Sequence, residues 1–199
     1  MKYIEFRHLV KTPLFTPQDL SLLGATYTPS QLTSWQRKGY ITKLRGRLYA
    51  FTDSLKDIEP EILSANLHSP SYLSLEYALS HYGIIPEAVY SYTAVTSKTT
   101  RSYTLPQGHF TYRHLPPHLF FGYQIINSLT LPYNLAEPEK ALLDYFYLTP
   151  SIKNSKDLGE LRLNPETLQP DKLHEYLHHF DSRRLDYLAQ LMEEMHAHH

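Results

Sequence analysis

The chain has 199 residues, of which 42% are hydrophobic, and a formal net charge of −1, so it can form one domain or two small ones around a real core. It contains no Cys, which excludes disulfides and thiolate metal sites. No apolar run approaches the roughly 20 residues that span a bilayer. The charged N-terminus has no apolar signal core. We therefore expect a cytoplasmic protein without a membrane partner.

The small net charge hides an uneven distribution along the sequence. Residues 1–56 hold nine Lys or Arg against three Asp or Glu, a net of +6, whereas the rest holds ten against seventeen, a net of −7. A basic beginning and an acidic remainder indicate two functional parts, the first facing a polyanion. We place the boundary in the polar stretch 53–60 and predict a first domain over 1–56 and a second over 57–199.

Two short helices are predicted in the basic part. Thr16-Pro17 has the residues of an N-cap and first helical position, and this helix runs to Gly24. Thr28 and Pro29 likewise have the residues of an N-cap and first helical position, and Gly39 ends this second helix. Leu32 and Trp35 are spaced so that both face inward on that second helix.

The remaining face of the second helix carries small polar and basic side chains. Such a face is suited to the major groove of DNA, where hydroxyl and amide groups contact base edges. The predicted DNA-contacting residues of this segment are Thr28, Ser30, Gln31, Thr33, Ser34, Arg37 and Lys38.

A basic hairpin follows at once. Strand-forming residues lie on both sides of Arg45-Gly46-Arg47, and this pattern predicts a hairpin with its tip at these three residues. Helix, turn, helix and basic hairpin is the plan of a winged helix-turn-helix, in which Lys43, Arg45 and Arg47 would contact phosphates and release counterions. A small helical cap with a charged surface hairpin is the structural alternative. RNA binding is disfavoured because no aromatic stacking pattern is present.

The acidic part reads as an α+β domain with an antiparallel sheet and terminal helices. Ser69 and Pro70 predict a helix start, followed by an apolar stripe that ends at Gly83. Alternating patterns predict strands over 90–96, 110–114 and 119–126. Further helices are predicted from Pro138, with Ala141, Leu142 and Tyr145 inward, and over 171–180 and 182–196.

Three stretches resemble a known family. They are LTSWQRKGYITKLRGRLYAF (32–51), SPSYLSLEYALSHYGIIPE (69–87) and LAEPEKALLDYFYL (135–148), and the similarity covers most of residues 6–163. Together they resemble the AbiEi-type antitoxins of type IV toxin–antitoxin, or abortive-infection, systems.

The resemblance implies a non-enzymatic, phage-defence function without a cofactor. The N-terminal winged helix would bind double-stranded DNA at operator inverted repeats and repress the protein's own operon as a transcriptional regulator, which is compatible with a dimer on DNA. The C-terminal domain would counteract a nucleotidyltransferase-like toxin, and a stable complex with that toxin is not required.

Two motifs keep an enzymatic alternative open. HEYLH, from His174 to His178, has the spacing of a zinc hydrolase site with Glu175 as base; the structural alternative is an amphipathic terminal helix with Leu173 and Leu177 inward. Glu137, Glu139, Lys140 and Asp144 could imitate a metal-dependent nuclease centre, but they also fit a helix N-terminus and an i, i+4 ion pair. The structural interpretation is preferred in both cases, so we expect no catalytic residues and no bound metal.

Overall fold

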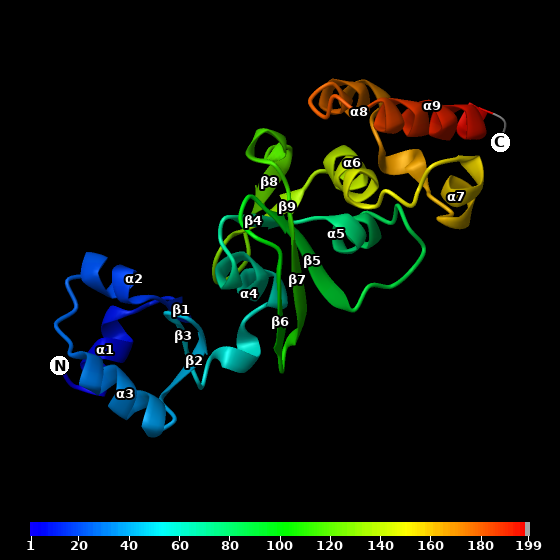
Figure 1. The fold of residues 1–199 in the computed structure, drawn as a ribbon. Coiled ribbons are helices and arrows are strands. Elements are labelled where there is room, and N and C mark those ends of the chain that lie inside the picture. Colours follow the sequence, from blue (N-terminus) through cyan, green and yellow to red (C-terminus); the bar gives the residue numbers. More distant parts are fainter. Residues whose placement is uncertain (198–199) are drawn as a thin grey trace.

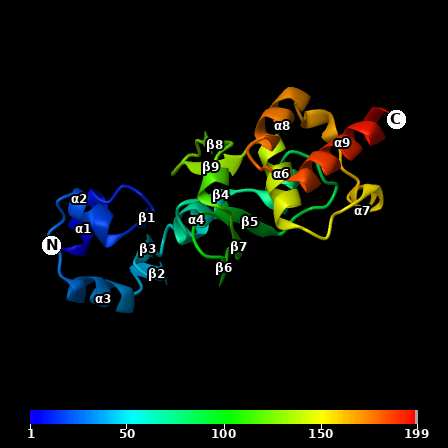
Figure 2. The ribbon, with the colours of Figure 1, turned by 45° about the horizontal axis from the view of Figure 1, so that its top comes forward.

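The computed structural model describes residues 1–197 and has a mixed α+β fold. Two regions lie side by side, joined by a short segment that includes a 3₁₀ helix over Leu55–Asp57 (Figures 1 and 2). Residues 1–56 are called the N-terminal region below, and residues 57–197 the second region. None of the described helices is long and apolar enough to cross a membrane.

The N-terminal region contains three helices and a small sheet. Its elements are α1 (Tyr3–Leu9), β1 (Leu14–Phe15), α2 (Pro17–Leu22), α3 (Pro29–Arg37), β2 (Ile41–Arg45) and β3 (Leu48–Phe51). The strands pair antiparallel in the order β1-β3-β2. The helices and the sheet enclose a core of their own, whose residues are Phe6, Val10, Phe15, Leu20, Leu32, Trp35, Ile41 and Phe51.

Local signals set the ends of these helices as the sequence predicts. Thr16 and Thr28 each accept a hydrogen bond from the backbone N–H three residues later, and a Pro follows each of them at the first helical position. Gly39 follows the C-cap of α3 with φ +74°, a left-handed conformation that favours glycine. The two predicted helices are therefore confirmed.

The second region is built on a six-stranded sheet. Its strands are β4 (Ser71–Leu73), β5 (Ser91–Thr96), β6 (Arg101–Leu105), β7 (Gly108–His114), β8 (Tyr123–Ile126) and β9 (Tyr133–Ala136). Its helices are α4 (Pro60–Leu67), α5 (Leu75–His81), α6 (Pro138–Leu148), α7 (Ser155–Glu160), α8 (Pro170–Leu177) and α9 (Arg183–Ala197), with short 3₁₀ turns at Pro117–Leu119 and Pro165–Thr167. The strand order is β6-β7-β5-β4-β9-β8.

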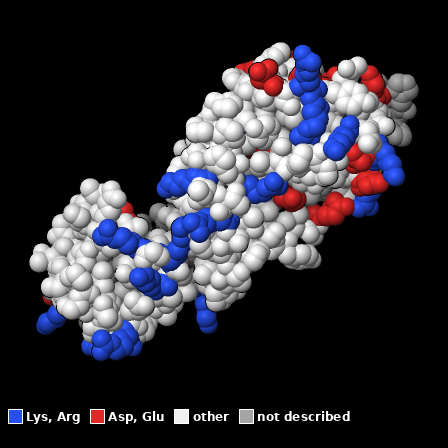
Figure 3. Space-filling model, in the orientation of Figure 1, with Lys and Arg blue, Asp and Glu red and all other residues white. Residues whose placement is uncertain are grey.

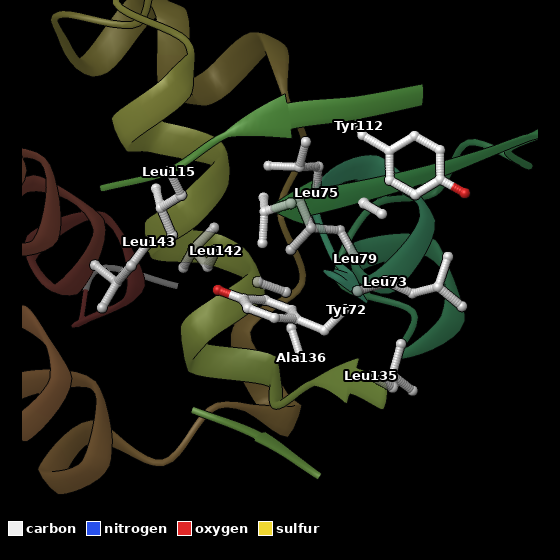
Figure 4. Packing of buried hydrophobic residues seen from close by; sticks show 14 of the residues in the cluster. Tyr72, Leu73, Leu75, Leu79, Tyr112, Leu115, Leu135, Ala136, Leu142 and Leu143 are labelled. Atoms are coloured by element: carbon white, nitrogen blue, oxygen red, sulfur yellow. The ribbon is translucent and has the colours of Figure 1, made fainter. Parts of the chain in front are cut away.

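Helices cover both faces of this sheet. Tyr112 points to the face covered by α4, where its hydroxyl donates to the carbonyl of Ser64 at 2.6 Å. Tyr72 points to the opposite face, where its hydroxyl donates to Asp144 of α6 at 2.9 Å. Figure 4 shows Tyr72 extending toward α6 and Tyr112 pointing away from it. Helix α5 packs beside α6, and α7 to α9 lie beyond α6 (Figure 1).

The structure corrects the predicted start of the helix after Ser69. Pro70 precedes strand β4, and the helix begins only at Leu75, with Ser74 as N-cap. Strand β4 lies between β5 and β9 in the middle of the sheet, and its buried Tyr72 and Leu73 contribute to both covered faces. Burial in the sheet therefore overrides the local Ser-Pro helix signal, since propensity is weak beside tertiary packing.

The sheet also differs from the antiparallel one expected from the sequence. The pairs β4–β9 and β5–β7 are parallel, so the sheet is mixed. The strand predicted over 119–126 forms only at Tyr123–Ile126, because Gly122 has φ +68° and turns the chain just before it. The strands over 90–96 and 110–114 and the helices near 138, 171 and 182 are confirmed with shifted ends.

The two regions share part of their packing. Leu14, Leu48 and Ala50 belong to the N-terminal sheet, yet they join the larger core, which otherwise consists of second-region residues. One face of the small sheet thus packs inward on its own helices and the other packs on the second region. This contact fixes the β2–β3 hairpin against the six-stranded sheet.

Candidate nucleic-acid interface

Helix α3 presents two different faces. Leu32 and Trp35 are 6% exposed, and the Trp35 ring lies 4.6 Å from that of Phe6 in the N-terminal core. The exposed side carries Ser30, Thr33, Arg37 and Lys38. Because the apolar pair holds the helix on its core, the polar face stays accessible to a partner.

Two of the predicted base-contacting residues, Thr28 and Gln31, form hydrogen bonds at the start of α3, and a third, Ser34, is less exposed than the rest. The Thr28 hydroxyl caps α3 and lies 2.8 Å from the hydroxyl of Ser30. Gln31 is half-buried: its amide oxygen accepts from the Thr28 N–H at 2.8 Å, and its amide nitrogen donates to the Met1 carbonyl at 2.9 Å. Ser34 is also half-buried. Gln31 is therefore a capping residue. Ser30, Thr33, Arg37 and Lys38 remain the exposed candidates on α3, with the Thr33 hydroxyl donating to the Pro29 carbonyl at 3.1 Å and retaining its acceptor capacity.

The β2–β3 hairpin places two cations in solvent. Lys43 and Arg47 are exposed, and neither forms an ion pair within residues 1–197. Gly46 at the tip has φ +50°, which agrees with the predicted tight turn. Exposed cations without internal counter-charges are what a phosphate-contacting hairpin requires.

Arg45 is placed differently from its two neighbours. Its guanidinium is half-buried and lies 4.5 Å from the centre of the Tyr103 ring of β6. It also donates to the carbonyl of Leu67 and lies 3.2 Å from Nδ1 of His68. The sequence predicts a phosphate contact for Arg45, but the structure uses this side chain to attach the hairpin to the second region.

The hydrogen bonds of His68 define its protonation. An Arg can only donate and a carbonyl can only accept, so Nδ1 accepts from Arg45 while Nε2–H donates to the Thr99 carbonyl at 2.9 Å. Burial lowers the pKa of His68, and the positive charges of Arg45, Lys98 and Arg101 lower this pKa further, against an opposing effect of the bond to Thr99. His68 is therefore neutral at pH 7 in this arrangement.

Basic side chains continue across the junction. Lys98 and Arg101 lie on and beside the turn between β5 and β6, and both are exposed. Figure 3 shows Lys and Arg spread over the N-terminal region and the adjoining part of the second region, whereas most Asp and Glu on this face gather over the far end. The charge asymmetry of the sequence thus becomes a spatial asymmetry, with its basic side crossing the boundary at residue 56.

The second candidate site, the carboxylates near α6, lies inside the protein. Lys140 and Asp144 form an ion pair whose side chains are fully buried. Asp144 accepts from Tyr72 and Ser74 at 2.9 Å each, and the Lys140 ammonium lies 5.0 Å from the centre of the Phe121 ring. Burial lowers the pKa of Lys140 and raises the pKa of Asp144, and their mutual attraction opposes both shifts.

The two glutamates beside this pair have protein partners of their own. Glu137 accepts from the ammonium of Lys172 at 2.8 Å and from the hydroxyl of Tyr176, both on α8. One oxygen of Glu139 accepts from the Gln169 N–H at 2.8 Å, and the other has no partner within the described residues. These contacts attach α8 to the start of α6. The sequence predicts the i, i+4 ion pair between Lys140 and Asp144, but it does not predict that this pair is buried.

The two histidines and the glutamate of the HEYLH motif are exposed on α8 and at its C-cap. His174 Nδ1 donates to the Pro170 carbonyl at 3.0 Å, and its Nε2 lies 3.5 Å from a carboxylate oxygen of Glu193 on α9. Leu173 and Leu177 are buried, as the amphipathic-helix interpretation predicts. Within residues 1–197, no group of three His, Asp or Glu side chains is arranged to hold a metal ion. His198 and His199 lie outside the described residues.

Comparison with known proteins adds no assignment: no protein-family model matches the chain, and no curated protein sequence matches it.

Sequence reasoning missed the part of the candidate interface that lies beyond residue 56. Lys98 and Arg101 belong to a part of the chain that is acidic as a whole, although residues 88–136 contain no Asp or Glu. The contact between Arg45 and the Tyr103 ring places β6 beside the hairpin. The exposed run SKTTR (97–101) between two strands was the available signal.

Proposed function

We propose that this protein is a DNA-binding regulator whose N-terminal region acts as a winged helix-turn-helix. In this proposal α3 is the recognition helix in the major groove, and the β2–β3 hairpin is the wing that contacts the phosphate backbone. The observation that carries the proposal is the combination of an accessible polar face on α3 with exposed cations on the next hairpin that form no ion pair among residues 1–197.

The contacts divide into two kinds. Lys43, Arg47 and Arg37 would contact phosphates, which are the same in every sequence, so these contacts would position the protein on any duplex. Ser30 and Thr33 are short side chains on the exposed face of α3, so they would contact base edges in the groove. Arg45 has no part in the proposed interface, because its guanidinium is bound within the protein.

We further propose that the protein is a type IV antitoxin that represses its own operon. The resemblance of three sequence stretches to AbiEi-type proteins supports this part of the proposal. The second region would then relieve the toxicity of a nucleotidyltransferase-like partner without a stable complex. The contacts around Lys140 and Glu137 fit a structural role there, and the proposal assigns the second region no catalysis.

Duplex binding tests the first part. Full-length protein is titrated into a labelled duplex from the region upstream of its own gene, at several salt concentrations, and compared with Lys43→Ala/Arg47→Ala. Each lost phosphate contact lowers the slope of log affinity against log salt by roughly 0.9. The double variant is therefore expected to weaken binding to all duplexes alike. Unchanged affinity and slope would remove the wing from the proposal.

Growth rescue tests the second part. The proposal predicts a nucleotidyltransferase-like gene beside the protein's own gene. That gene is co-expressed with full-length protein or with Lys43→Ala/Arg47→Ala, each of these two from an unrelated promoter. If antitoxicity belongs to the second region, the DNA-binding variant rescues growth as well as the original protein does. Loss of rescue in this variant, at equal protein levels, would show that repression and antitoxicity are one activity.

A further inference from the structure

A hollow of about 620 Å³ opens at the junction of the two regions. It is lined by His68, Ser97, Lys98, Thr99, Thr100 and His114, which come from the end of α4, the β5–β6 turn and the end of β7. We call it the junction hollow. It contains no acidic side chain and borders the Arg45 contact, because His68 belongs to both.

The lining offers several hydrogen-bond donors. The hydroxyls of Ser97 and Thr99 have no hydrogen-bond partner within the described residues, and Thr100 Oγ1 accepts from the His114 N–H at 3.1 Å, which leaves its own O–H to donate. The Lys98 ammonium uses one N–H on the Ser69 carbonyl at 2.6 Å and retains two others. Hydroxyl and ammonium donors together are suited to an oxyanion.

The charges around the hollow all have the same sign. Arg45, Lys98 and Arg101 are the charged groups that act on His68, and neither Lys98 nor Arg101 forms an ion pair within residues 1–197. Clustering cations without counter-charges costs free energy through mutual repulsion, and a bound anion would relieve that repulsion. Elsewhere in the second region, Lys140, Arg162 and Lys172 each have a carboxylate partner, whereas the exposed Lys153 and Lys156 have none among residues 1–197.

We propose that the junction hollow binds a phosphate group, with Lys98 and Arg101 as counter-charges and the hydroxyls of Ser97, Thr99 and Thr100 as donors. The phosphate belongs either to the backbone of a duplex or to a free phosphorylated ligand. The duplex source rests on the proposed function, since α3 and the hairpin would bring the DNA; the free-ligand source is independent of it.

The site is coupled to the hairpin through one residue. His68 contacts Arg45 on its Nδ1 side and lines the hollow, with its Nε2–H held by Thr99 of the same turn. A phosphate that moves the 97–100 turn therefore acts directly on the contact that attaches the hairpin to the second region.

Two titrations of the full chain test the site and distinguish its sources. The first follows pyrophosphate binding by calorimetry, and the second follows duplex binding by fluorescence anisotropy across salt concentrations. Both use Lys98→Gln/Arg101→Gln, a change of two exposed side chains. The control is Lys153→Gln/Lys156→Gln, which removes the same charge from exposed positions near α7. Thermal melting of each variant checks that the fold is kept.

Loss of pyrophosphate binding in the test variant alone supports a site for a free phosphate. A salt slope for the duplex that falls by roughly two units in the test variant alone supports a backbone contact. The proposal is overturned if both titrations are the same for test and control variants, or if the original protein binds neither probe. If Lys43→Ala/Arg47→Ala weakens duplex binding while Lys98→Gln/Arg101→Gln changes neither duplex binding nor pyrophosphate binding, the proposed function stands and the hollow proposal fails.

Discussion

The β2–β3 hairpin of the N-terminal region and the start of α6 in the second region treat charged side chains in opposite ways. On the β2–β3 hairpin, Lys43 and Arg47 are exposed and have no ion-pair partner in the described part of the chain. In the second region, Lys140 and Asp144 are fully buried and satisfy each other. A charge with a partner inside the chain supports the fold, whereas a charge without one is available to bind something else. Arg45 shows that this distinction cannot be made by sequence position alone. It lies between the exposed Lys43 and Arg47, but its side chain is bound within the protein and supports the fold.

Breaking the buried pair is expected to have the largest effect. Asp144→Ala leaves the Lys140 ammonium buried without a counter-charge and deprives Tyr72 and Ser74 of their acceptor. We expect a loss of about 3–5 kcal/mol in the free energy of unfolding, measured by urea denaturation. The double change Lys140→Met/Asp144→Leu should recover part of this loss, because no buried charge is then left without a partner. The recovery should be incomplete, because the hydroxyls of Tyr72 and Ser74 still lack their acceptor.

The exposed ion pair between Arg162 and Glu87 supplies the control. Both side chains are more than half exposed, so Glu87→Ala should cost between about 0 and 1 kcal/mol. Equal losses for Asp144→Ala and Glu87→Ala would contradict the structural role given to the buried pair.

Arg45 and Arg47 form the sharpest comparison within one hairpin. Arg45→Ala removes charge-assisted hydrogen bonds to Leu67 and His68, so we expect it to lower the free energy of unfolding by about 1.5–3 kcal/mol. Arg47→Ala should leave stability within about 0.5 kcal/mol, as for most surface changes, and flatten the salt slope of duplex binding by roughly one unit. Urea denaturation of both variants measures the change in the free energy of unfolding, and fluorescence anisotropy measures the change in the salt slope of duplex binding. The reverse assignment of the two effects would show that Arg45 is the phosphate contact.

A glycine pair isolates the packing around Lys140. Gly122 and Gly83 have nearly equal φ values, +68° and +69°, so Ala meets the same backbone strain of about 1–2 kcal/mol at both. A Cβ at Gly122 would lie 3.0 Å from Cγ of Lys140, whereas one at Gly83 would have nothing within 4 Å. We therefore expect Gly122→Ala to reduce the melting temperature more than Gly83→Ala does. Equal reductions in melting temperature would mean that the aliphatic part of Lys140 moves away from the new Cβ without loss of stability.

The smallest expected effect is a dependence on pH at the junction of the regions. The pKa of His68 is lowered in the fold, so the folded state binds fewer protons there, and stability falls as the pH drops from about 6.5 through the folded-state pKa. Melting temperatures at about pH 7.5 and about pH 5 should therefore differ less for His68→Gln than for the original protein. The exposed His118 provides the control, since His118→Gln should leave that difference unchanged.

The sequence by itself determined the features whose causes are local. Thr16 and Thr28 cap their helices through bonds to residues three positions away, and Gly39 and Gly46 supply the left-handed conformations that end α3 and turn the hairpin. Leu32 and Trp35 enter the core because their spacing matches the helix period. The caps and the turns join residues within a turn or two of chain, and the helix period is also a local property, so a short window of sequence predicts them even though Trp35 packs on the distant Phe6.

Tertiary structure alone decided the features whose partners are distant in sequence. Arg45 finds Leu67, His68 and Tyr103, and Gln31 finds Met1, across 22 to 58 residues of chain. The helix signal at Ser69 and Pro70 lost to a strand in the middle of the sheet, and that sheet became mixed through pairings between segments far apart in sequence. Which cations remain available to a partner follows from these long-range contacts, because only they determine which charges are already neutralised or buried.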